Sequence, residues 1–315
     1  MLEAIERIRE NIARVYFGNP DAIDRLLACV LARGHALIED VPGVGKTLLA
    51  SGLARSLGGT FSRIQLTPDL LPSDLLGVSI YDRETGRFDF KRGPIFANIV
   101  LADEINRTPP RTQAAMLEAM SESAVTIDGL RHRLGPPFSV IATQNPYRFE
   151  GTYTLPENEL DRFLIKTSLG YAPPDSEARV LEQRPASTVL DSLEPVISSE
   201  EVVRLQNRTD EIRVDRSLIE YVIEIARVTR ESPDVWLGLS TRGTLALTQL
   251  ARATALLAGR DYAIPEDIIG NVLPVCGHRV LLREDLASAG GTGGDSDAAT
   301  RQYLTDLLES TAAPA

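Results

Sequence analysis

Short apolar runs alternate with longer stretches of helical periodicity through the first half of the chain. Continuous apolar runs predict strands that are buried on both faces of a parallel sheet, and alternation over 61–66 predicts one more strand. The apolar runs lie at 36–38 and 99–102, and two further strands are predicted at 138–143 and 164–169. Between these strands the chain carries helix signals, so the pattern predicts an α/β domain.

Helical periodicity is clearest at the N-terminus and after two of the predicted strands. Residues 2–15 place their apolar side chains on one helical face, and Asn19-Pro20 is typical of a cap that opens a helix running to Arg33. The side chains on that first face are Leu2, Ile5, Ile8, Ile12 and Val15. Further helices are predicted from Lys46 and from Pro109-Pro110 to Met120.

Two segments of the first half have the pattern of β-hairpins. Residues 78–92 carry aromatic side chains around the turn Glu84-Thr85-Gly86, and residues 124–134 turn at Asp128-Gly129. On composition alone, the first segment is best interpreted as an edge hairpin that shields the core.

The pattern changes at Ala172-Pro173-Pro174, where strand signals stop and helix signals dominate. We therefore predict an α/β domain over 1–172 and a second, all-helical domain over 173–315. Its helices are expected at about 175–184, 199–209, 215–230, 242–258 and 265–273.

Composition is that of an ordinary globular protein, with 43% hydrophobic and 24% charged residues among 315. A net charge of −11 and a pI near 4.9 argue against a non-specific nucleic-acid binder, although a local basic pore remains compatible with them. Cys29 and Cys276 lack metal-ligand spacing and are expected to be reduced core residues. No apolar run is long enough for a membrane span, and the N-terminus is not signal-like, so a cytoplasmic protein is expected.

The stretch 36–47, Ala-Leu-Ile-Glu-Asp-Val-Pro-Gly-Val-Gly-Lys-Thr, predicts a strand, a glycine-rich loop and a helix start. Such a loop suits a polyphosphate, because glycines let backbone N–H groups crowd around the anion at a helix N-terminus. Lys46 can then reach the β- and γ-phosphates, and the Thr47 hydroxyl can ligate Mg²⁺. The residues expected to surround the nucleotide are Pro42, Gly43, Val44, Gly45, Lys46, Thr47 and Leu48.

The alternative for this stretch is a surface turn before an ordinary helix, because short motifs recur by accident. Asp40 stands where the full phosphate-loop consensus has glycine. The tight turn must therefore be made by Pro42-Gly43 alone.

Two carboxylates end the buried run Ile99-Val100-Leu101-Ala102. Ligands of open α/β sheets gather at the carboxyl edge of the strands. There Asp103 would hold Mg²⁺ through water, and Glu104 would orient and deprotonate the attacking water. Acids that simply end a strand are the alternative, and the upstream phosphate loop makes it the weaker one.

Three further polar residues are candidates for a functional role. Asn145 leaves a strand at the same edge, where it can bridge the γ-phosphate and the lytic water or simply form an Asx-turn before Pro146. Arg162 follows a short helix, and a surface ion pair with Asp161 or Glu159 would explain it. Arg242 lies in the first turn of a predicted helix, where the helix dipole disfavours a cation, so a phosphate can be its partner.

Five strings in this order, VPGVGKT, IVLADE, ATQNP, LPENELDRF and LSTRG, resemble the MoxR-type AAA+ ATPases. The likeness covers about residues 10–310 and includes the linking strings QLTPDLLPSDLLG and FKRGPIFANIVLADEINRTPPRTQAAMLEAM. The resemblance implies an αβα sandwich with parallel strands in the order 5-1-4-3-2, followed by a small helical lid.

The same resemblance implies roles for single residues. Lys46 and Thr47 match Walker A, and Asp103 and Glu104 match Walker B. Three more positions match as well: Asn145 resembles sensor 1, Arg162 the arginine finger supplied to a neighbouring subunit, and Arg242 the sensor 2 that reaches the γ-phosphate from the lid. The hairpin at 78–92 resembles the helix-2 insert of this clade, which changes its interpretation from scaffold to working element.

As implications of the resemblance, we expect ATP and Mg²⁺ as ligands and a self-associated ring, typically a hexamer. Von Willebrand A-domain proteins and protein clients are the expected partners, in chaperone-like remodelling, assembly or activation. Two alternatives of other classes are a DNA-associated AAA+ motor, which the acidic composition disfavours, and a nucleotide-gated signalling scaffold. The intact Asp103-Glu104 pair argues against the scaffold, since a pure switch needs no water activator.

Overall fold

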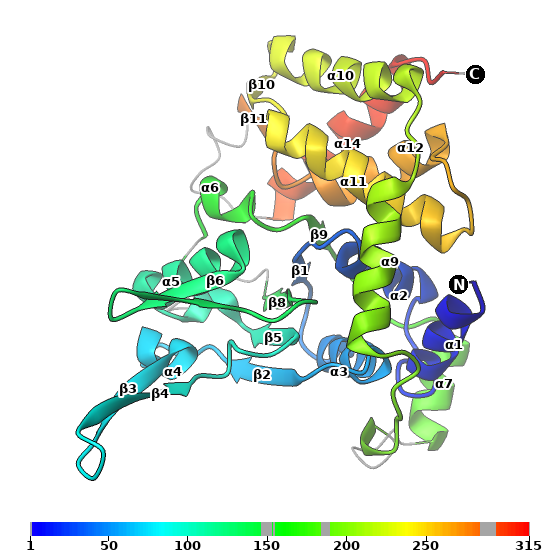
Figure 1. Cartoon of the computed structure of the whole chain (residues 1–315). Helices are drawn as coiled ribbons and strands as arrows, with labels where there is room; N and C mark the ends of the chain where they lie inside the picture. The colour runs from blue at the N-terminus through cyan, green and yellow to red at the C-terminus, as the bar shows by residue number, and fades with distance from the viewer. Residues whose placement is uncertain (1, 146–152, 154, 184–189, 284–293, 315) are drawn as a thin grey trace.

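The computed structural model describes residues 2–145, 153, 155–183, 190–283 and 294–314. Its centre is a sheet of five parallel strands, flanked by helices and followed by a helical part that lies over one end of the sheet (Figure 1). The strands in spatial order are β2 (Phe61–Gln65), β5 (Ile99–Asp103), β8 (Ser139–Gln144), β1 (Ala36–Glu39) and β9 (Ile165–Thr167).

This order confirms the expected topology. When the five strands are numbered in chain order, their spatial order from β9 to β2 is 5-1-4-3-2. β5 is buried along its whole length, as the apolar run at 99–102 predicts. Because all five strands are parallel, everything that follows a strand lies at one edge of the sheet and everything that precedes a strand lies at the other. We call these the carboxyl edge and the amino edge.

Helices cover both faces of the sheet. Ala36 and Ile38 of β1 pack in one apolar cluster with α1 (Leu2–Ala13), α2 (Pro20–Leu31) and α3 (Lys46–Ser56), whereas Leu37 packs in a second cluster with α5 (Pro110–Glu122). Alternate residues of a strand point to opposite faces, so this split is what a strand buried on both sides requires. The connecting elements are α4 (Pro72–Leu76), the 3-10 helix η1 (Ile105–Arg107) and α6 (Glu157–Leu160).

The N-terminal helix largely follows its predicted face. Ile5, Ile8 and Ile12 are fully buried, and Val15 is buried just beyond the helix end. Leu2 departs from the prediction with 52% exposure, because it is the first residue of the helix and only its tip lies against Gly259. The predicted cap of α2 is confirmed, since the side chain of Asn19 accepts a hydrogen bond from the backbone N–H of Asp21.

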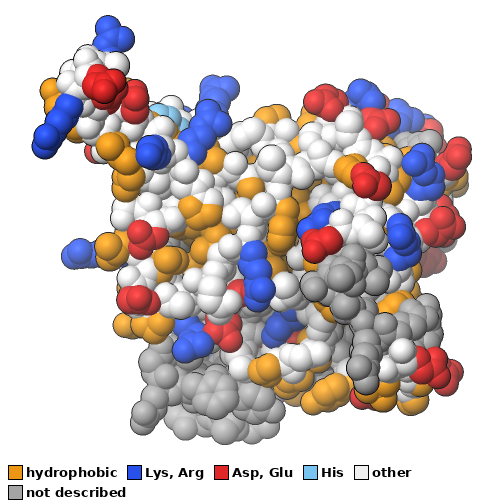
Figure 2. Space-filling view, turned by 90° about the horizontal axis from the view of Figure 1, so that it is seen from below, with side chains coloured by type: hydrophobic (Ala, Val, Ile, Leu, Met, Phe, Trp, Pro, Cys, Tyr) orange, Lys and Arg blue, Asp and Glu red, His pale blue; other side chains and the backbone are white. Residues whose placement is uncertain are grey.

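Both predicted hairpins are present. β3 (Gly77–Asp82) pairs with β4 (Arg87–Arg92), and β6 (Ala124–Ile127) pairs with β7 (Leu130–Arg133) through a turn in which Asp128 and Gly129 both have positive φ. β3 and β4 reach far from the body of the molecule (Figure 1). The surface seen from below carries a protrusion on which basic, acidic and hydrophobic side chains mix (Figure 2).

The C-terminal part is mainly helical. Its helices are α7 (Pro174–Gln183), α9 (Ser199–Glu211), α10 (Arg216–Glu231), α11 (Thr241–Leu257), α12 (Pro265–Cys276) and α14 (Gly294–Ser310). One expectation was wrong, because this part is not all-helical: β10 (Val235–Leu237) pairs with β11 (Leu281–Leu282) in a small antiparallel sheet. Strands of two and three residues are too short to show an alternation that sequence analysis can detect.

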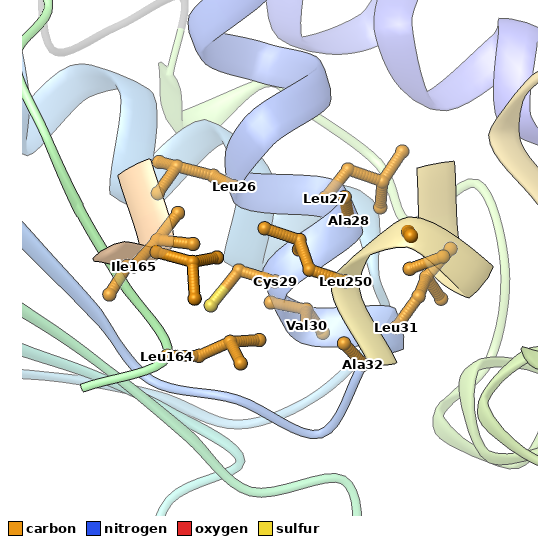
Figure 3. Close-up of a cluster of buried hydrophobic side chains, with 14 of the residues drawn as sticks. Leu26, Leu27, Ala28, Cys29, Val30, Leu31, Ala32, Leu164, Ile165 and Leu250 are labelled. Atoms are coloured by element: carbon orange, nitrogen blue, oxygen red, sulfur yellow. The ribbon is translucent and has the colours of Figure 1, made fainter. Parts of the chain in front are cut away.

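A shared apolar cluster joins the helical part to the α/β core. Figure 3 shows that side chains of α2 lie between β9 and α11, with Leu164 and Ile165 on one side and Leu250 on the other. Cys29 is buried in this cluster, and burial raises the pKa of its thiol. Each fully buried aliphatic side chain contributes roughly 1.5–3 kcal/mol relative to exposure, so the two parts are held together chiefly by this packing.

Residues 194–196, which precede α9, also lie along the core. The side chain of Asn11 donates to the carbonyl of Glu194, and the backbone N–H of Val196 donates to Ser56. The proposed division at 172/173 stays a prediction. No helix in the described part of the chain combines the length and apolar character that crossing a bilayer requires.

Candidate nucleotide-binding site

The predicted phosphate loop connects β1 to α3 at the carboxyl edge. Gly43 and Gly45 have φ of 90° and 88°, a left-handed conformation that side chains disfavour, so both positions need glycine for conformational reasons. α3 begins at Lys46, and Gly45 before it has no side chain to cap the first N–H groups. Those uncapped donors and the helix dipole make this turn suited to an anion. Residues 42–48, predicted to surround the nucleotide, therefore form this loop and the first turn of its helix.

The ammonium group of Lys46 folds back onto the loop. Its Nζ donates to the backbone carbonyls of Asp40 and Val41. Burial lowers the pKa of Lys46, and the carboxylates around it, among them Asp40, Asp103 and Glu104, act in the opposite direction. The Lys46 ammonium thus lies among carboxylates at the loop, where it can bind an entering phosphate.

Asp40 makes hydrogen bonds that explain why an aspartate stands at this position instead of the consensus glycine. Its Oδ2 accepts hydrogen bonds from the backbone N–H groups of Leu169 and Gly170, each at 2.8 Å, and its Oδ1 accepts from Val41. The carboxylate therefore ties the start of the phosphate loop to the chain leaving β9. Long-range contacts of this kind have no signature in the local sequence.

Tyr16 lies under the loop and is a residue that sequence reasoning missed. A side chain at Gly45 would meet the Tyr16 ring at 3.4 Å, and one at Gly18 would collide with its hydroxyl. Burial raises the pKa of Tyr16 to about 12. Tyr16 belongs to no motif, and its only sequence signal was its place near segments that contain glycine.

Asp103 ends β5, which pairs with β8, and is 6% exposed. Its Oδ1 accepts from the Thr143 hydroxyl at 3.2 Å, and its Oδ2 accepts from Arg63 Nε at 2.7 Å. Thr143 also accepts the backbone N–H of Glu104 at 3.0 Å, so one hydroxyl positions both acids. The only sequence signal of Thr143 was a hydroxyl directly after the apolar run Val140-Ile141-Ala142.

Glu104 has a left-handed backbone, with φ of 60°, which non-glycine residues adopt mainly where the surrounding structure enforces it. Its Oε2 accepts from Arg107 Nη1 at 2.7 Å and from Gln65 Nε2 at 3.3 Å. Asn145 follows β8, which lies between β5 and β1 in the sheet. The structure thus brings the loop, the two acids and Asn145 together at the carboxyl edge.

Arg162 lies at the amino edge instead. It follows α6 and precedes β9, and its Nη1 donates to the Leu117 carbonyl and the Ser121 hydroxyl of α5, each at 2.7 Å. These contacts take the place of the local ion pair with Asp161 or Glu159. The same last turn of α5 binds His35, which directly precedes β1, so this position is at the opposite end of the strands from the phosphate loop.

Arg242 joins Arg162 at the amino edge. Its Nη1 lies 3.6 Å from Asp161 Oδ2, and its side chain is 63% exposed. A cavity of about 340 Å³ opens there between the core and α11. Its lining includes Arg33, Asp161, Arg162, Arg242 and Arg279. In the described structure Arg242 is therefore grouped with Arg162 rather than with the phosphate loop of its own chain.

The residues at the carboxyl edge fit Mg²⁺ and a nucleoside triphosphate. Thr47 supplies a hydroxyl and Asp103 a carboxylate, which are ligands that Mg²⁺ accepts directly or through water. Lys46 and the uncapped N–H groups of α3 supply the positive charge that a polyphosphate needs. This sheet order, loop and acid pair define a P-loop nucleotide-binding protein of the AAA+ class.

Comparisons with known proteins agree with this class. Residues 35–165 match the ATPase family associated with various cellular activities (AAA), and residues 227–299 match the AAA lid domain. The chain is 39% identical over 293 residues to Chaperone MoxR1 of Mycobacterium tuberculosis, covering 90% of this chain and 77% of that protein. The chain belongs to the MoxR family of AAA+ ATPases.

Two further likenesses extend over most of the chain. The Uncharacterized protein YeaC of Bacillus subtilis is 51% identical over 276 residues, which cover 88% of this chain and 86% of the relative. The crystal structure of a protein from Cytophaga hutchinsonii, provisionally assigned as an ATPase, superposes with a TM-score of 0.88 at 36% identity. That match covers 100% of this chain and 96% of the other.

Proposed function

We propose that this chain hydrolyses ATP to ADP and phosphate in a ring of identical subunits, typically a hexamer, and uses the energy to remodel, assemble or activate protein targets. The observation that carries the proposal is the division of charged residues between two edges of one sheet. The phosphate loop and the acid pair lie at the carboxyl edge, and Arg162 and Arg242 lie at the amino edge.

Each residue then has one task at a shared site. Lys46 binds the β- and γ-phosphates, and Thr47 and Asp103 hold Mg²⁺, which when bound supplies charge that offsets the phosphate oxygens. Arg63 is 53% exposed, so it can leave Asp103 when that carboxylate turns to the ion. Glu104 takes the proton of the attacking water, and Asn145 orients the water against the γ-phosphate.

Arg162 and Arg242 act on the ATP of the neighbouring subunit. A ring built from a heterologous interface brings the amino edge of one subunit to the carboxyl edge of the next. Positive charge supplied there in trans stabilises the transition state. We therefore assign both arginines to the neighbour's nucleotide, which extends the sequence-based role of Arg242.

The two hairpins are the parts that we assign to client contact. Ser79 donates to Asp128 at 2.6 Å and Phe90 stacks against His132 with ring centroids 4.3 Å apart, so the hairpins form one unit. Phe88 near the tip is 71% exposed, which leaves an aromatic side chain for a protein target. A von Willebrand A-domain protein is the expected partner that delivers or selects such targets.

The experiment that tests the activity compares phosphate release by the wild-type chain and by Glu104→Gln, with Mg²⁺ and ATP. Gln keeps the size of the side chain but takes no proton, so we expect turnover to fall about 10²–10⁴-fold while nucleotide affinity stays unchanged. Wild-type turnover by the variant would contradict the assignment of Glu104. Stimulation of the wild-type rate by DNA, and not by protein targets, would favour the DNA-motor alternative.

A further inference from the structure

Arg279 links the helical part to the segment that carries Arg162. It lies between α12 and β11, and its side chain is 4% exposed. Its Nε donates to Asp161 Oδ1 at 2.7 Å. Its remaining nitrogens donate to backbone carbonyls of the core, namely Asp161 at 3.1 Å, Phe163 at 2.6 Å and Leu164 at 3.1 Å.

These bonds fix the backbone on both sides of Arg162. The planar guanidinium presents several donors in a rigid fork, which a lysine cannot reproduce. A buried carbonyl without a donor is costly, so this segment gains its position from the arginine. Among the described residues no hydrogen bond joins Arg279 to the Arg162 side chain, and its bonds to Asp161 and Phe163 act on that residue through the backbone.

Arg279 is also linked to Arg242, through the carboxylate of Asp161. Asp161 receives Arg279 on Oδ1 and lies 3.6 Å from Arg242 through Oδ2, so one carboxylate joins the two arginines. Gly243, next to Arg242 in the first turn of α11, leaves room for this arrangement. A Cβ at Gly243 would lie 3.2 Å from Arg279 Cδ and closer still to Leu239.

We propose that Arg279 is a positioning residue that sets Arg162 and Arg242 together for the neighbouring subunit's ATP, by tying the helical part to residues 161–164. The inference rests on the proposed function, because it presupposes that these arginines act in trans. Movement of the helical part relative to the core then displaces both arginines at once. Arg279 would thus couple the lid position of one subunit to hydrolysis in the next.

The test is complementation between two inactive variants, Arg279→Gln and Glu104→Gln. The first keeps its own phosphate loop and acids but misplaces its arginines, and a misplacement of about 1 Å can lower kcat about 10²-fold. The second keeps its arginines but cannot activate water. We expect Arg279→Gln alone to bind a fluorescent ATP analogue like the wild type. In rings assembled at random from equal amounts of the two variants, roughly a quarter of the interfaces should be active. At these interfaces the Arg279→Gln subunit supplies the phosphate loop and acids, and the Glu104→Gln subunit supplies the arginines.

Two controls separate the possible failures. Asp297→Asn removes the ion pair of α14 with Lys166 on the same strand β9 without touching residues 161–164, and it should keep wild-type turnover. Arg162→Ala mixed with Glu104→Gln should complement as well. If Arg162→Ala complements and Arg279→Gln does not, or if Arg279→Gln alone is fully active, the role of Arg279 is overturned. If neither mixture regains activity, the action in trans is itself overturned.

Discussion

The two edges of the central sheet hold their charged residues in different ways. At the carboxyl edge the charges are satisfied within the chain: Lys46 donates to loop carbonyls, Asp103 receives Arg63, and Glu104 receives Arg107. At the amino edge the hydrogen-bond acceptors of Arg162 among the described residues are neutral, with the Glu159 carboxylate nearby, and Arg242 shares Asp161 with Arg279. Asp161 is the single carboxylate among the described residues that line the cavity there.

The difference indicates that one edge is equipped to bind and the other to activate. The carboxyl edge has the phosphate loop, Asp103 and Glu104 in one place. Among the described residues that line the cavity at the amino edge, arginines outnumber carboxylates, which suits an anion arriving from outside. In the ring that we propose, each subunit contributes one half of two ATPase sites, and the two halves act on different nucleotides.

The largest effect should come from the amino edge. Removing the guanidinium in Arg162→Ala takes away transition-state charge, and in related NTPases a residue with this role is worth roughly 10³–10⁵ in rate. The affinity for ATP should not change, because the phosphate loop lies at the opposite edge. Phosphate release and nucleotide titration on the same preparation measure both quantities.

A matched substitution guards against a general effect of losing an arginine. Arg216→Ala removes an exposed side chain that pairs with Glu220 on α10 and should leave turnover unchanged. If Arg162→Ala abolished nucleotide binding along with turnover, the separation of the two edges would be wrong.

At the carboxyl edge, Lys46→Ala should show the opposite behaviour. Truncating one partner of a charge pair costs about 2–5 kcal/mol, so the affinity for ATP should fall by about 10² or more. Isothermal titration with a slowly hydrolysed ATP analogue measures this loss. The Lys46→Ala variant keeps Arg162 and Arg242, so it should still raise the turnover of a neighbouring subunit whose phosphate loop and Glu104 are intact. Unchanged affinity would remove Lys46 from the site.

Arg242→Ala should have a smaller effect than Arg162→Ala. The side chain is half-exposed and only loosely paired, and a hydrogen bond to a charged group contributes about 1.5–3 kcal/mol, or about 10–10² in rate. Turnover in rings formed from Arg242→Ala chains and Lys46→Ala chains decides which nucleotide it serves. If Arg242 acted on its own chain's ATP, these mixtures would regain no activity, whereas action in trans restores it at mixed interfaces.

The smallest predicted effect concerns stability at the amino edge. His35 accepts from the Val140 N–H and donates to the Met120 carbonyl, and burial lowers its pKa to about 4 from an ordinary 6.5. The unfolded chain therefore takes up the proton first, and stability falls as the pH drops from 6.5 towards 4. Between neutral pH and pH 5 this residue should cost about 2 kcal/mol.

Urea unfolding at pH 7 and pH 5 tests that prediction, with His35→Gln as the comparison. The variant should lose about 2 kcal/mol less on acidification than the wild type does. Burial lowers the pKa of His278 as well, so both proteins should retain some pH dependence. An identical loss in the two proteins would show that His35 is not held neutral.

Local signals in the sequence were sufficient for most of the fold and for the carboxyl edge. Glycines before Lys46, acids after an apolar strand, and Asp128-Gly129 in a turn each act through their immediate neighbours, so periodicity and turn chemistry predict them. The site residues that were missed, Tyr16 and Thr143, work through contacts between segments far apart in the chain. Such contacts depend on how the strands are ordered.

The amino edge was the least predictable part for the same reason. Arg162 and Arg242 are eighty positions apart, and the docking of α11 against the core brings Arg242 to Asp161, next to Arg162. The substitution of Asp40 for glycine looked like a defect until its bonds to Leu169 and Gly170 were known. Sequence patterns show which residues are unusual, and the tertiary structure shows what they touch.

The central claim is that one subunit binds ATP and its neighbour completes the site. The most direct test is the ATPase rate per subunit as a function of protein concentration, with Mg²⁺ and without any partner. The account predicts a specific rate that rises with concentration as rings form, and that stays near zero for Arg162→Ala at every concentration. A specific rate that is high and independent of concentration in the monomer range would contradict the account.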